Sequence, residues 1–190
     1  VTYYGRSTSS GTATAWSSVT STTYNAGTRY CYAVIAETDN YASCTTANTS
    51  FTIAKASFTS TVSISGYTYA GTKSTPTVSN NPGSGTVTYY GRSASGGTAT
   101  EWSNVTNTTY NAGTRYIYAV IAETTNYNGY TTAEVSFTIA KASFTTTVSI
   151  SGYTYGGTKS TPSVGSNPGN GIVTYYGRST SSGTATAWSS

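Results

Sequence analysis

The sequence predicts an all-β protein built from tandem antiparallel β-sandwiches, with about seven strands in each repeat of 86 residues. The first observation is a period: the segment VTYYGRS begins at Val1, Val87 and Val173. The second is local patterning, because short runs rich in Thr, Val and Tyr alternate with Gly-, Asn- and Pro-rich turns about every 8 to 12 residues. No run shows the 3.6-residue periodicity of an amphipathic helix. A fixed period combined with strand-and-turn patterning indicates a β-repeat protein.

The boundaries between repeats are expected where the segment SFTIAKASFT occurs, close to Lys55 and Lys141. These positions divide the chain into the C-terminal part of one repeat, a complete repeat and the N-terminal part of a third, at residues 1–55, 56–141 and 142–190. Residues 1–18 are identical to residues 173–190, so we interpret the chain as a window of a longer array. The Ala-Lys-Ala linkers are short and poor in Gly and Ser, which favours limited bending between neighbours.

Within the complete repeat, residue preferences predict the strands in order. Thr, Val, Ile and Tyr favour strands, whereas clusters of Gly, Asn and Pro form turns. The expected turns are residues 66–71 and 80–85, and Gly96-Gly97 interrupts a further strand pair. The expected strands are Phe58 to Ser65, Thr75 to Ser79, Thr86 to Arg92, Thr98 to Val105, Thr114 to Ala122 and Thr131 to Ile139.

A set of motifs in the complete repeat resembles the bacterial immunoglobulin-like tandem repeats of the MBG type, found in large cell-surface and secreted proteins. The motifs, in chain order, are Gly66-Tyr-Thr-Tyr-Ala-Gly71, Thr75-Pro-Thr-Val78, Asn81-Pro-Gly-Ser-Gly85, Asn111-Ala-Gly113, Asn126-Tyr-Asn-Gly129 and Phe137-Thr-Ile-Ala-Lys-Ala142. This resemblance implies tandem immunoglobulin-like sandwiches in an extracellular protein, either at the cell surface or secreted. It also implies a stalk, spacer or adhesive role, and it brings no catalytic residues with it.

Composition argues against most other classes of function. The nine basic residues are scattered along the chain, whereas phosphate binding needs cations gathered on one face, so we expect no nucleic-acid partner. No apolar run approaches the length of about 20 residues that a membrane helix needs, so no membrane insertion is expected in this segment. The chain has no His, which excludes Ser-His-Asp and Cys-His catalysis and His-based metal sites. We therefore predict a protein that is not an enzyme and uses no cofactor or metal.

Two cysteines raise the question of a disulfide. Cys31 and Cys44 are the only cysteines, and the residues 86 positions later are Ile117 and Tyr130. Because both changes fall in one repeat, a disulfide between them is predicted, closing a loop of about 14 residues that stabilises by about 3 kcal/mol in the chain-entropy model. The alternative is one buried thiol that acts as a small hydrophobic side chain and one unrelated thiol.

Aromatic residues support an alternative function as a glycan-binding or adhesive module. Tyr90, Trp102 and Tyr127 are candidate contacts for host or environmental glycans, although packing within the domain is the favoured explanation for such residues. Because neighbouring residues on a strand point to opposite faces, one member of Tyr89-Tyr90 is expected to face the core and the other solvent.

The N-glycosylation pattern Asn-x-Ser/Thr occurs three times in the chain. Asn48, Asn104 and Asn107 are thus candidate N-glycosylation sites, although chance occurrence of the pattern in a Thr-rich chain is the favoured explanation.

The favoured function is a structural repeat unit that forms the shaft or stalk of an extracellular bacterial surface protein or fibre. Its expected partners are neighbouring copies of the same repeat, joined by covalent continuity or by strand exchange in a self-assembling fibre. We favour a continuous array, because joining two incomplete ends would leave a surplus copy of the duplicated 18 residues.

Overall fold

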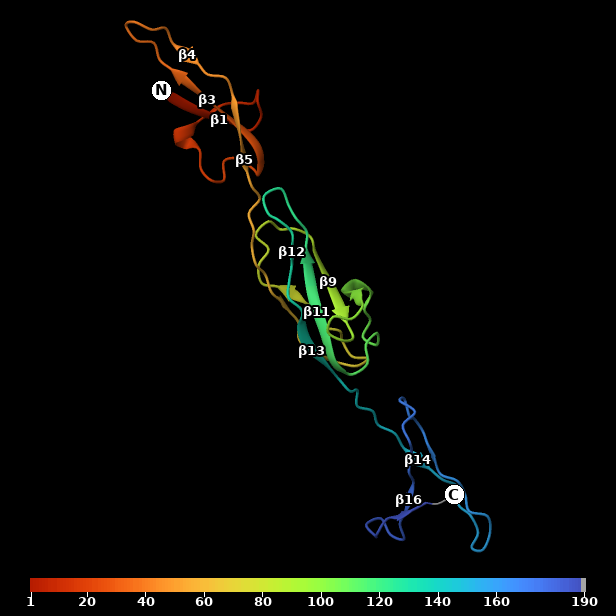
Figure 1. Ribbon diagram of the computed structural model, residues 1–190. Helices are drawn as coiled ribbons and strands as arrows, with labels where there is room; N and C mark the ends of the chain where they lie inside the picture. Colours follow the sequence, from red (N-terminus) through yellow and green to blue (C-terminus); the bar gives the residue numbers. More distant parts are fainter. Residues whose placement is uncertain (189–190) are drawn as a thin grey trace. The chain divides into compact units, whose positions relative to one another are not determined.

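The computed structural model describes residues 1–188, and they form an all-β protein, as the sequence predicts. The chain divides into two compact units, Val1–Lys141 and a second that begins at Ala142 (Figure 1). Apart from strands, the described residues contain two 3₁₀ helices of three residues each. The first unit holds the predicted complete repeat, residues 56–141, and the shorter sheet that precedes it.

A mixed sheet forms the larger part of the complete repeat. Its strands lie in the order β10-β9-β11-β13-β7, and β12 also pairs with β11. All pairings are antiparallel except that of β7 with β13. The strand bounds are β7 Tyr67–Thr68, β9 Val87–Arg92, β10 Ala99–Glu101, β11 Gly113–Ile121, β12 Tyr130–Thr131 and β13 Val135–Ala140.

A two-stranded antiparallel sheet, β6 (Val62–Ser63) with β8 (Thr77–Val78), contributes to the core against β11 and β13. On β11 the residues Ile117, Ala119 and Ile121 are buried, whereas the residues between them are half-buried. This two-residue alternation is the pleat of a strand with one face on the core. The buried cluster consists of Val62, Tyr67, Trp102, Val105, Tyr110, Ile117, Ala119, Phe137 and Ile139.

The first 53 residues form a second sheet, called here the first-repeat sheet. Its strands lie in the order β2-β1-β3-β4, and β5 also pairs with β3. Tyr4 lies opposite Tyr32, in the register that places Tyr90 opposite Tyr118 in the complete repeat. The bounds are β1 Thr2–Arg6, β2 Thr14–Ala15, β3 Gly27–Ile35, β4 Cys44–Thr45 and β5 Thr49–Ile53, with a 3₁₀ helix η1 at Trp16–Ser18.

The second unit repeats two hairpins of the complete repeat. β14 (Val148–Ser149) pairs with β15 (Ser163–Val164) in the register of β6 with β8. β16 (Tyr176–Gly177) pairs with β17 (Thr186–Ala187) in the register of β9 with β10. Local pairing is therefore the same in both units.

The long strand of each repeat begins at a turn that an arginine stabilises. Gly113 opens β11 with φ of 126°, a region that favours glycine because it lacks a Cβ. The guanidinium of Arg115 then donates to the carbonyls of Asn111 and Ala112 in that turn and to Ser93. Arg29 makes the equivalent bonds in the first-repeat sheet. The Asn-Ala-Gly-Thr-Arg motif is thus a turn whose carbonyls are satisfied by its own arginine.

Four expectations about the strands were wrong. Residues 66–71 contain β7 as well as a turn, because β13 supplies a pairing partner some 70 positions along the chain. The strand expected at residues 98–105 ends at Glu101, and a 3₁₀ helix η2 follows at Trp102–Asn104, where Trp102 enters the core. The strand expected at 131–139 is divided into β12 and β13, and only Val62–Ser63 of the expected first strand is paired.

An ion pair ties the β9–β10 hairpin to the start of β13. Arg92 donates to Glu134 at 2.7 Å, and the Ser95 hydroxyl donates to the other carboxylate oxygen at 2.7 Å. The hydrogen bond from Ser95, together with Arg92, lowers the pKa of the Glu134 carboxyl. In the first-repeat sheet this position is Asn48, whose amide donates to the Ser9 carbonyl at 2.8 Å.

Replacing Ile121 by Ala should destabilise the complete repeat by about 2 to 5 kcal/mol, because the side chain is 1% exposed and its loss leaves a cavity. Ile35 occupies the same position in the first-repeat sheet and is 42% exposed, so Ile35→Ala is the matched control and should cost less. Hydrogen exchange of β11 and β3 amides measures both effects separately. Equal losses of stability in the two variants, measured in dilute solution, would contradict the prediction that the more buried side chain contributes more.

Acidification should weaken the contacts that Glu134 makes with Arg92 and Ser95. Its pKa is lower in the folded state, so its stabilisation is present above the unfolded pKa of about 4.3 and is lost as the pH falls through the folded value. Glu134→Gln should therefore reduce the acid-induced rise in β13 amide exchange. The first-repeat sheet carries Asn48 at this position and serves as an internal control; an unchanged pH profile in the variant would count against the contact.

Candidate functional site

The contact between the first-repeat sheet and the complete repeat is the candidate functional site, because its residues recur at the 86-residue period. Beside this contact, backbone hydrogen bonds fix the chain where it enters the complete repeat. Ala56 donates its N–H to the Asn126 carbonyl at 2.8 Å, and Asn128 donates to the Ala56 carbonyl at 2.9 Å. Ala56 and Tyr127 thus form a parallel bridge. The linker is held against the loop between β11 and β12.

A pair of asparagine side chains extends this junction. The Asn126 amide oxygen accepts the N–H of Ala26 at 2.9 Å, and its Nδ2 donates to Oδ1 of Asn25 at 3.0 Å. Lys55 also lies 3.3 Å from Glu123, but the Glu123 side chain is 70% exposed. Exposed ion pairs contribute about 0 to 1 kcal/mol, so the amide and backbone bonds define the junction.

The junction residues recur at the 86-residue period. Asn25, Lys55 and Ala56 of the linker side are repeated as Asn111, Lys141 and Ala142, and the loop residues Glu123, Asn126 and Tyr127 match Glu37, Asn40 and Tyr41. The earlier loop already has the same fold, since Thr38 donates to the Tyr41 carbonyl at 2.8 Å as Thr124 does to Tyr127 at 2.9 Å. Tyr41 is 79% exposed, whereas Tyr127 is half-buried. The loop thus has the same local fold in both places, and in the complete repeat Phe58 packs against its tyrosine.

A groove of about 280 Å³ lies at the same junction, lined by residues that include Tyr24, Ile53 and Tyr127. Its remaining lining is mainly Ala, Ser and Thr. Such a surface offers methyl groups and hydroxyls and no charged side chain, so it favours packing between repeats over binding of an ionic ligand.

Comparison with known protein families, curated proteins and solved structures found no match for this chain. The resemblance to MBG-type repeats is therefore carried by the motifs alone. Within residues 1–188 no three His, Cys, Asp or Glu side chains are grouped as a metal site would require. No helix in the same residues has the length and apolar character to span a bilayer.

The three candidate glycan contacts lie in different environments. Trp102 is 5% exposed, donates its indole N–H to the Ser74 carbonyl at 3.2 Å and packs edge-on against Phe137. Its prediction as an exposed platform was wrong, because the turn into η2 directs the ring into the core. Tyr127 packs edge-on against Phe58 at the junction, with ring centroids 6.2 Å apart.

Tyr90 lies on the face of the sheet opposite the core. Its ring stacks on Tyr118 at 5.2 Å, and the Arg92 guanidinium lies over Tyr118 at 4.5 Å. Its neighbour Tyr89 packs against the buried cluster, so the expected division of this tyrosine pair between two faces is confirmed. Tyr90 is half-buried by these contacts and shares no surface with Trp102.

The two cysteines are free thiols in this structure. Cys44 lies opposite Ile35, four residues along β3 from Cys31. Four residues of strand span about 13 Å, whereas a disulfide requires Cα atoms within about 7 Å. The predicted disulfide is not formed, because strand register separates the two positions. The half-buried Cys31 instead lies opposite Gly5 and Thr49.

The candidate glycosylation sites differ in how their amides are used. Asn104 is exposed and directly follows Ser103 at the end of η2. Asn107 is half-buried and donates to the carbonyls of Ala70 and Gly71, so modification of its nitrogen would displace both bonds. Asn48 is exposed, and its amide donates to Ser9. Glycosylation remains a prediction at all three, and Asn48 and Asn104 are the exposed ones.

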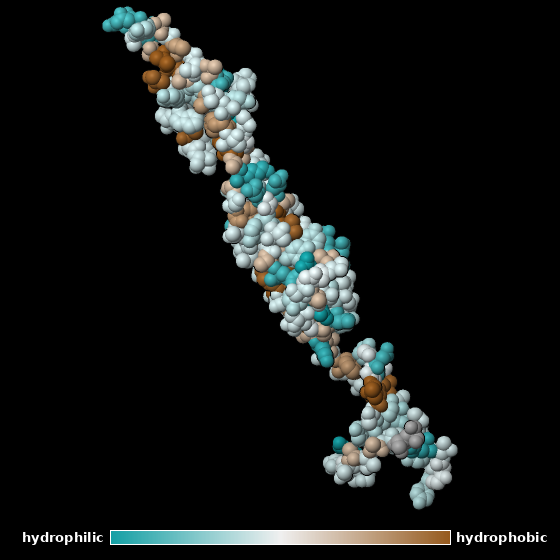
Figure 2. All heavy atoms as spheres, viewed as in Figure 1, coloured by the Kyte–Doolittle hydropathy of each residue, from teal (hydrophilic) through white to brown (hydrophobic). Residues whose placement is uncertain are grey.

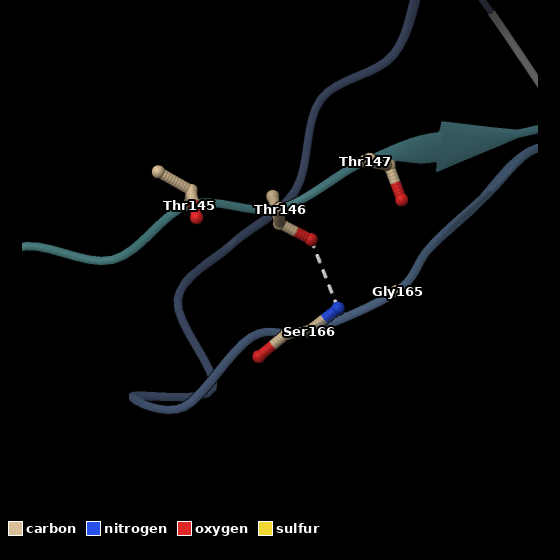
Figure 3. A pocket seen from close by; sticks show the side chains of 5 residues that line it. All are labelled: Thr145, Thr146, Thr147, Gly165 and Ser166. Atoms are coloured by element: carbon tan, nitrogen blue, oxygen red, sulfur yellow. Dashed lines mark hydrogen bonds between the residues drawn. The ribbon is translucent and has the colours of Figure 1, made fainter.

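A pocket in the second unit has a structural explanation. Thr145, Thr146, Thr147, Gly165 and Ser166 line a hollow of about 260 Å³, where Ser166 donates its N–H to the Thr146 hydroxyl at 2.9 Å (Figure 3). The equivalent bond in the complete repeat joins Asn80 to Ser60, which is 5% exposed. Of the five equivalent residues in the complete repeat only Ser60 is buried, so the pocket lies at a position that is largely exposed in both units.

Proposed function

We propose that this chain is a structural repeat unit that forms the shaft or stalk of an extracellular bacterial surface protein or fibre. Each complete repeat would be an immunoglobulin-like sandwich with its own core, and neighbouring repeats would meet through the same short junction. The observation that carries this proposal is the recurrence of the junction residues at the 86-residue period.

The contacts of the junction suit a spacer. Ala56 is bonded through both its N–H and its carbonyl, and Asn126 bonds through both atoms of its amide. Each hydrogen bond contributes about 0.5 to 1.5 kcal/mol, so several together limit bending without a large apolar interface. In a linear array, stability then comes from each repeat and from its contacts with its neighbours. Such an array holds a terminal domain at a distance from a surface.

The alternative function, a glycan-binding or adhesive module, has weaker support. Of its three candidate contacts, Trp102 is buried and Tyr127 packs at the junction. Tyr90 remains as a half-buried ring on the outer face. A glycan-binding face built from all three side chains would require them to lie on one exposed surface, and Trp102 is buried.

Immunoelectron microscopy of cells that produce this protein tests its place in a surface structure. Antibodies raised against the 190-residue chain should label fibres or stalks outside the cell, with label repeated along their length. Label confined to the cell interior would contradict the proposal. Pre-absorption of the antibodies with the purified chain is the control for specificity.

Asn126→Ala tests the junction itself. Loss of the amide removes the acceptor for the Ala26 N–H, so exchange of that amide should accelerate on the order of tenfold, and residual dipolar couplings should show a wider range of orientations between the two sheets. Asn40→Ala is the matched control, because Asn40 occupies the same position in the exposed earlier loop. Equal effects of both substitutions would show that the junction bond does not restrict bending.

A further inference from the structure

The dipeptide Asn-Gly occurs twice in the chain, at Asn128-Gly129 and at Asn170-Gly171. Glycine has no Cβ, so its backbone nitrogen can approach the side chain of the preceding residue more freely than the nitrogen of other residues. An asparagine amide in front of glycine is therefore the one most open to attack by the next backbone nitrogen. All four residues are exposed, so sequence and exposure do not separate the two sites.

The two glycine nitrogens differ in their hydrogen bonds. Gly171 donates its N–H to Oδ1 of Asn167 at 3.0 Å, and its carbonyl accepts Nδ2 of the same side chain at 2.7 Å. Within residues 1–188, by contrast, the Gly129 N–H donates to no group of the protein. The Gly129 nitrogen therefore has no acceptor that holds its proton, whereas the Gly171 nitrogen has one.

Asn128 lies in the loop between β11 and β12, at an end of the complete repeat where hydrophilic side chains gather (Figures 1 and 2). Its N–H donates to the Ala56 carbonyl at 2.9 Å, and its Nδ2 donates to the Ser57 hydroxyl at 3.1 Å. Two residues further on, Tyr130 pairs with Ile121. The peptide bond that follows Asn128 therefore lies between two anchored points, and both belong to the complete repeat.

We propose that Asn128 is a site of spontaneous deamidation, and that its isoaspartyl product loosens the chain where it enters the complete repeat. The Gly129 nitrogen loses its proton and attacks Cγ of Asn128, which forms a new C–N bond. The bond between Cγ and Nδ2 breaks, and Nδ2 leaves as ammonia with the proton. The product is a cyclic succinimide, and no group is oxidised or reduced.

Water opens the succinimide in either of two ways. Addition at Cγ breaks the new C–N bond and leaves an aspartate in an ordinary main chain. Addition at the α-carbonyl carbon of residue 128 breaks the original peptide bond, so the main chain continues through Cβ and Cγ as an isoaspartate. Overall, water is consumed and ammonia is released. Both products exchange a neutral amide for a negative charge, and the isoaspartate also lengthens the main chain by one carbon atom.

The added carbon atom falls between the bond of residue 128 to Ala56 and the pairing of Tyr130 with Ile121. A longer chain between two fixed points cannot keep both in their present geometry, so one attachment is released. The attachment to Ala56 is an isolated bridge, whereas β12 pairs at two positions and is followed by the buried Thr132. The bridge at Ala56 therefore opens. This modification goes beyond the proposed shaft function and does not depend on it.

Peptide mapping by mass spectrometry tests the site, with the full chain kept at mildly alkaline pH so that the glycine nitrogens lose protons more readily. Aspartate and isoaspartate should accumulate several-fold faster at Asn128 than at Asn170, and in urea the two rates should become similar. Asn128→Gln should abolish the product at this position, because its longer side chain closes a larger ring slowly, and should leave Asn170 unchanged. No product at Asn128, or an equal or faster rate at Asn170 in the folded chain, would overturn the proposal.

Ser84→Asn provides a matched control inside the complete repeat. Gly85 donates its N–H to Oδ1 of Asn81 at 3.0 Å, the arrangement that protects the site in the second unit. Ser84 has φ of 52°, close to the 50° of Asn170, so asparagine fits this backbone. Deamidation at position 84 should be several-fold slower than at Asn128 in the same molecule. An equal or faster rate would show that the hydrogen bond of the glycine does not decide which site reacts.

Hydrogen exchange tests the structural consequence. The deamidated chain carries an additional negative charge, so ion exchange separates it from the parent, and peptide mapping gives its isoaspartate content. The Ala56 N–H, which donates to the Asn126 carbonyl at 2.8 Å, should exchange several-fold faster in the isoaspartyl fraction than in freshly prepared Asn128→Asp. That variant has the charge but an ordinary main chain. Equal exchange of Ala56 in the two samples would overturn the loosening.

Discussion

The fold of the complete repeat depends on covering one face of its longest strand. Ile117, Ala119 and Ile121 are almost completely buried there, and removal of such apolar area from water contributes about 25 cal/mol per Å². The β6–β8 ladder has only two residue pairs, which is too little for stability in isolation. The β6–β8 pair therefore depends on the larger sheet for its stability, and Ile35, at the equivalent position of the first-repeat sheet, is 42% exposed.

Cations in this protein satisfy backbone carbonyls. Arg115 bonds to its own turn, and Lys73 bonds to the two carbonyls at η2, where partial burial lowers the pKa of the lysine. The end of a short 3₁₀ helix leaves carbonyls with free acceptor capacity, and a lysine that lies against Trp102 reaches those of Trp102 and Val105. Arg29, Arg115 and Lys73 are thus explained by the backbone carbonyls that they satisfy, whereas Lys55 and Arg92 pair with glutamates.

The junction and the core use different interactions. The core is apolar and buried, whereas the junction combines backbone bonds at Ala56 with the side-chain amide of Asn126. Hydrogen bonds to a side-chain amide are directional, so they set the orientation of neighbouring repeats without burying much apolar surface. A loop such as that of Tyr41 is already formed before it meets a neighbour, and this preorganisation reduces the entropy lost on contact.

The sequence by itself determined the 86-residue period, the all-β class and the positions of the strands at Val87 and Gly113, because turn residues and two-residue alternation are local signals. It also divided Tyr89 and Tyr90 between two faces. Burial could not be determined in this way: Trp16 and Trp102 have closely similar surroundings in sequence, yet 43% and 5% of each residue is exposed.

Tertiary structure decided the features that need a distant partner. β7 lies within an expected turn because β13 pairs with it, and Cys31 and Cys44 remain apart because strand register places Ile35 opposite Cys44. The physical reason is the same in each case. Propensity and periodicity act over a few residues, whereas pairing and burial depend on which other segment of chain covers the surface.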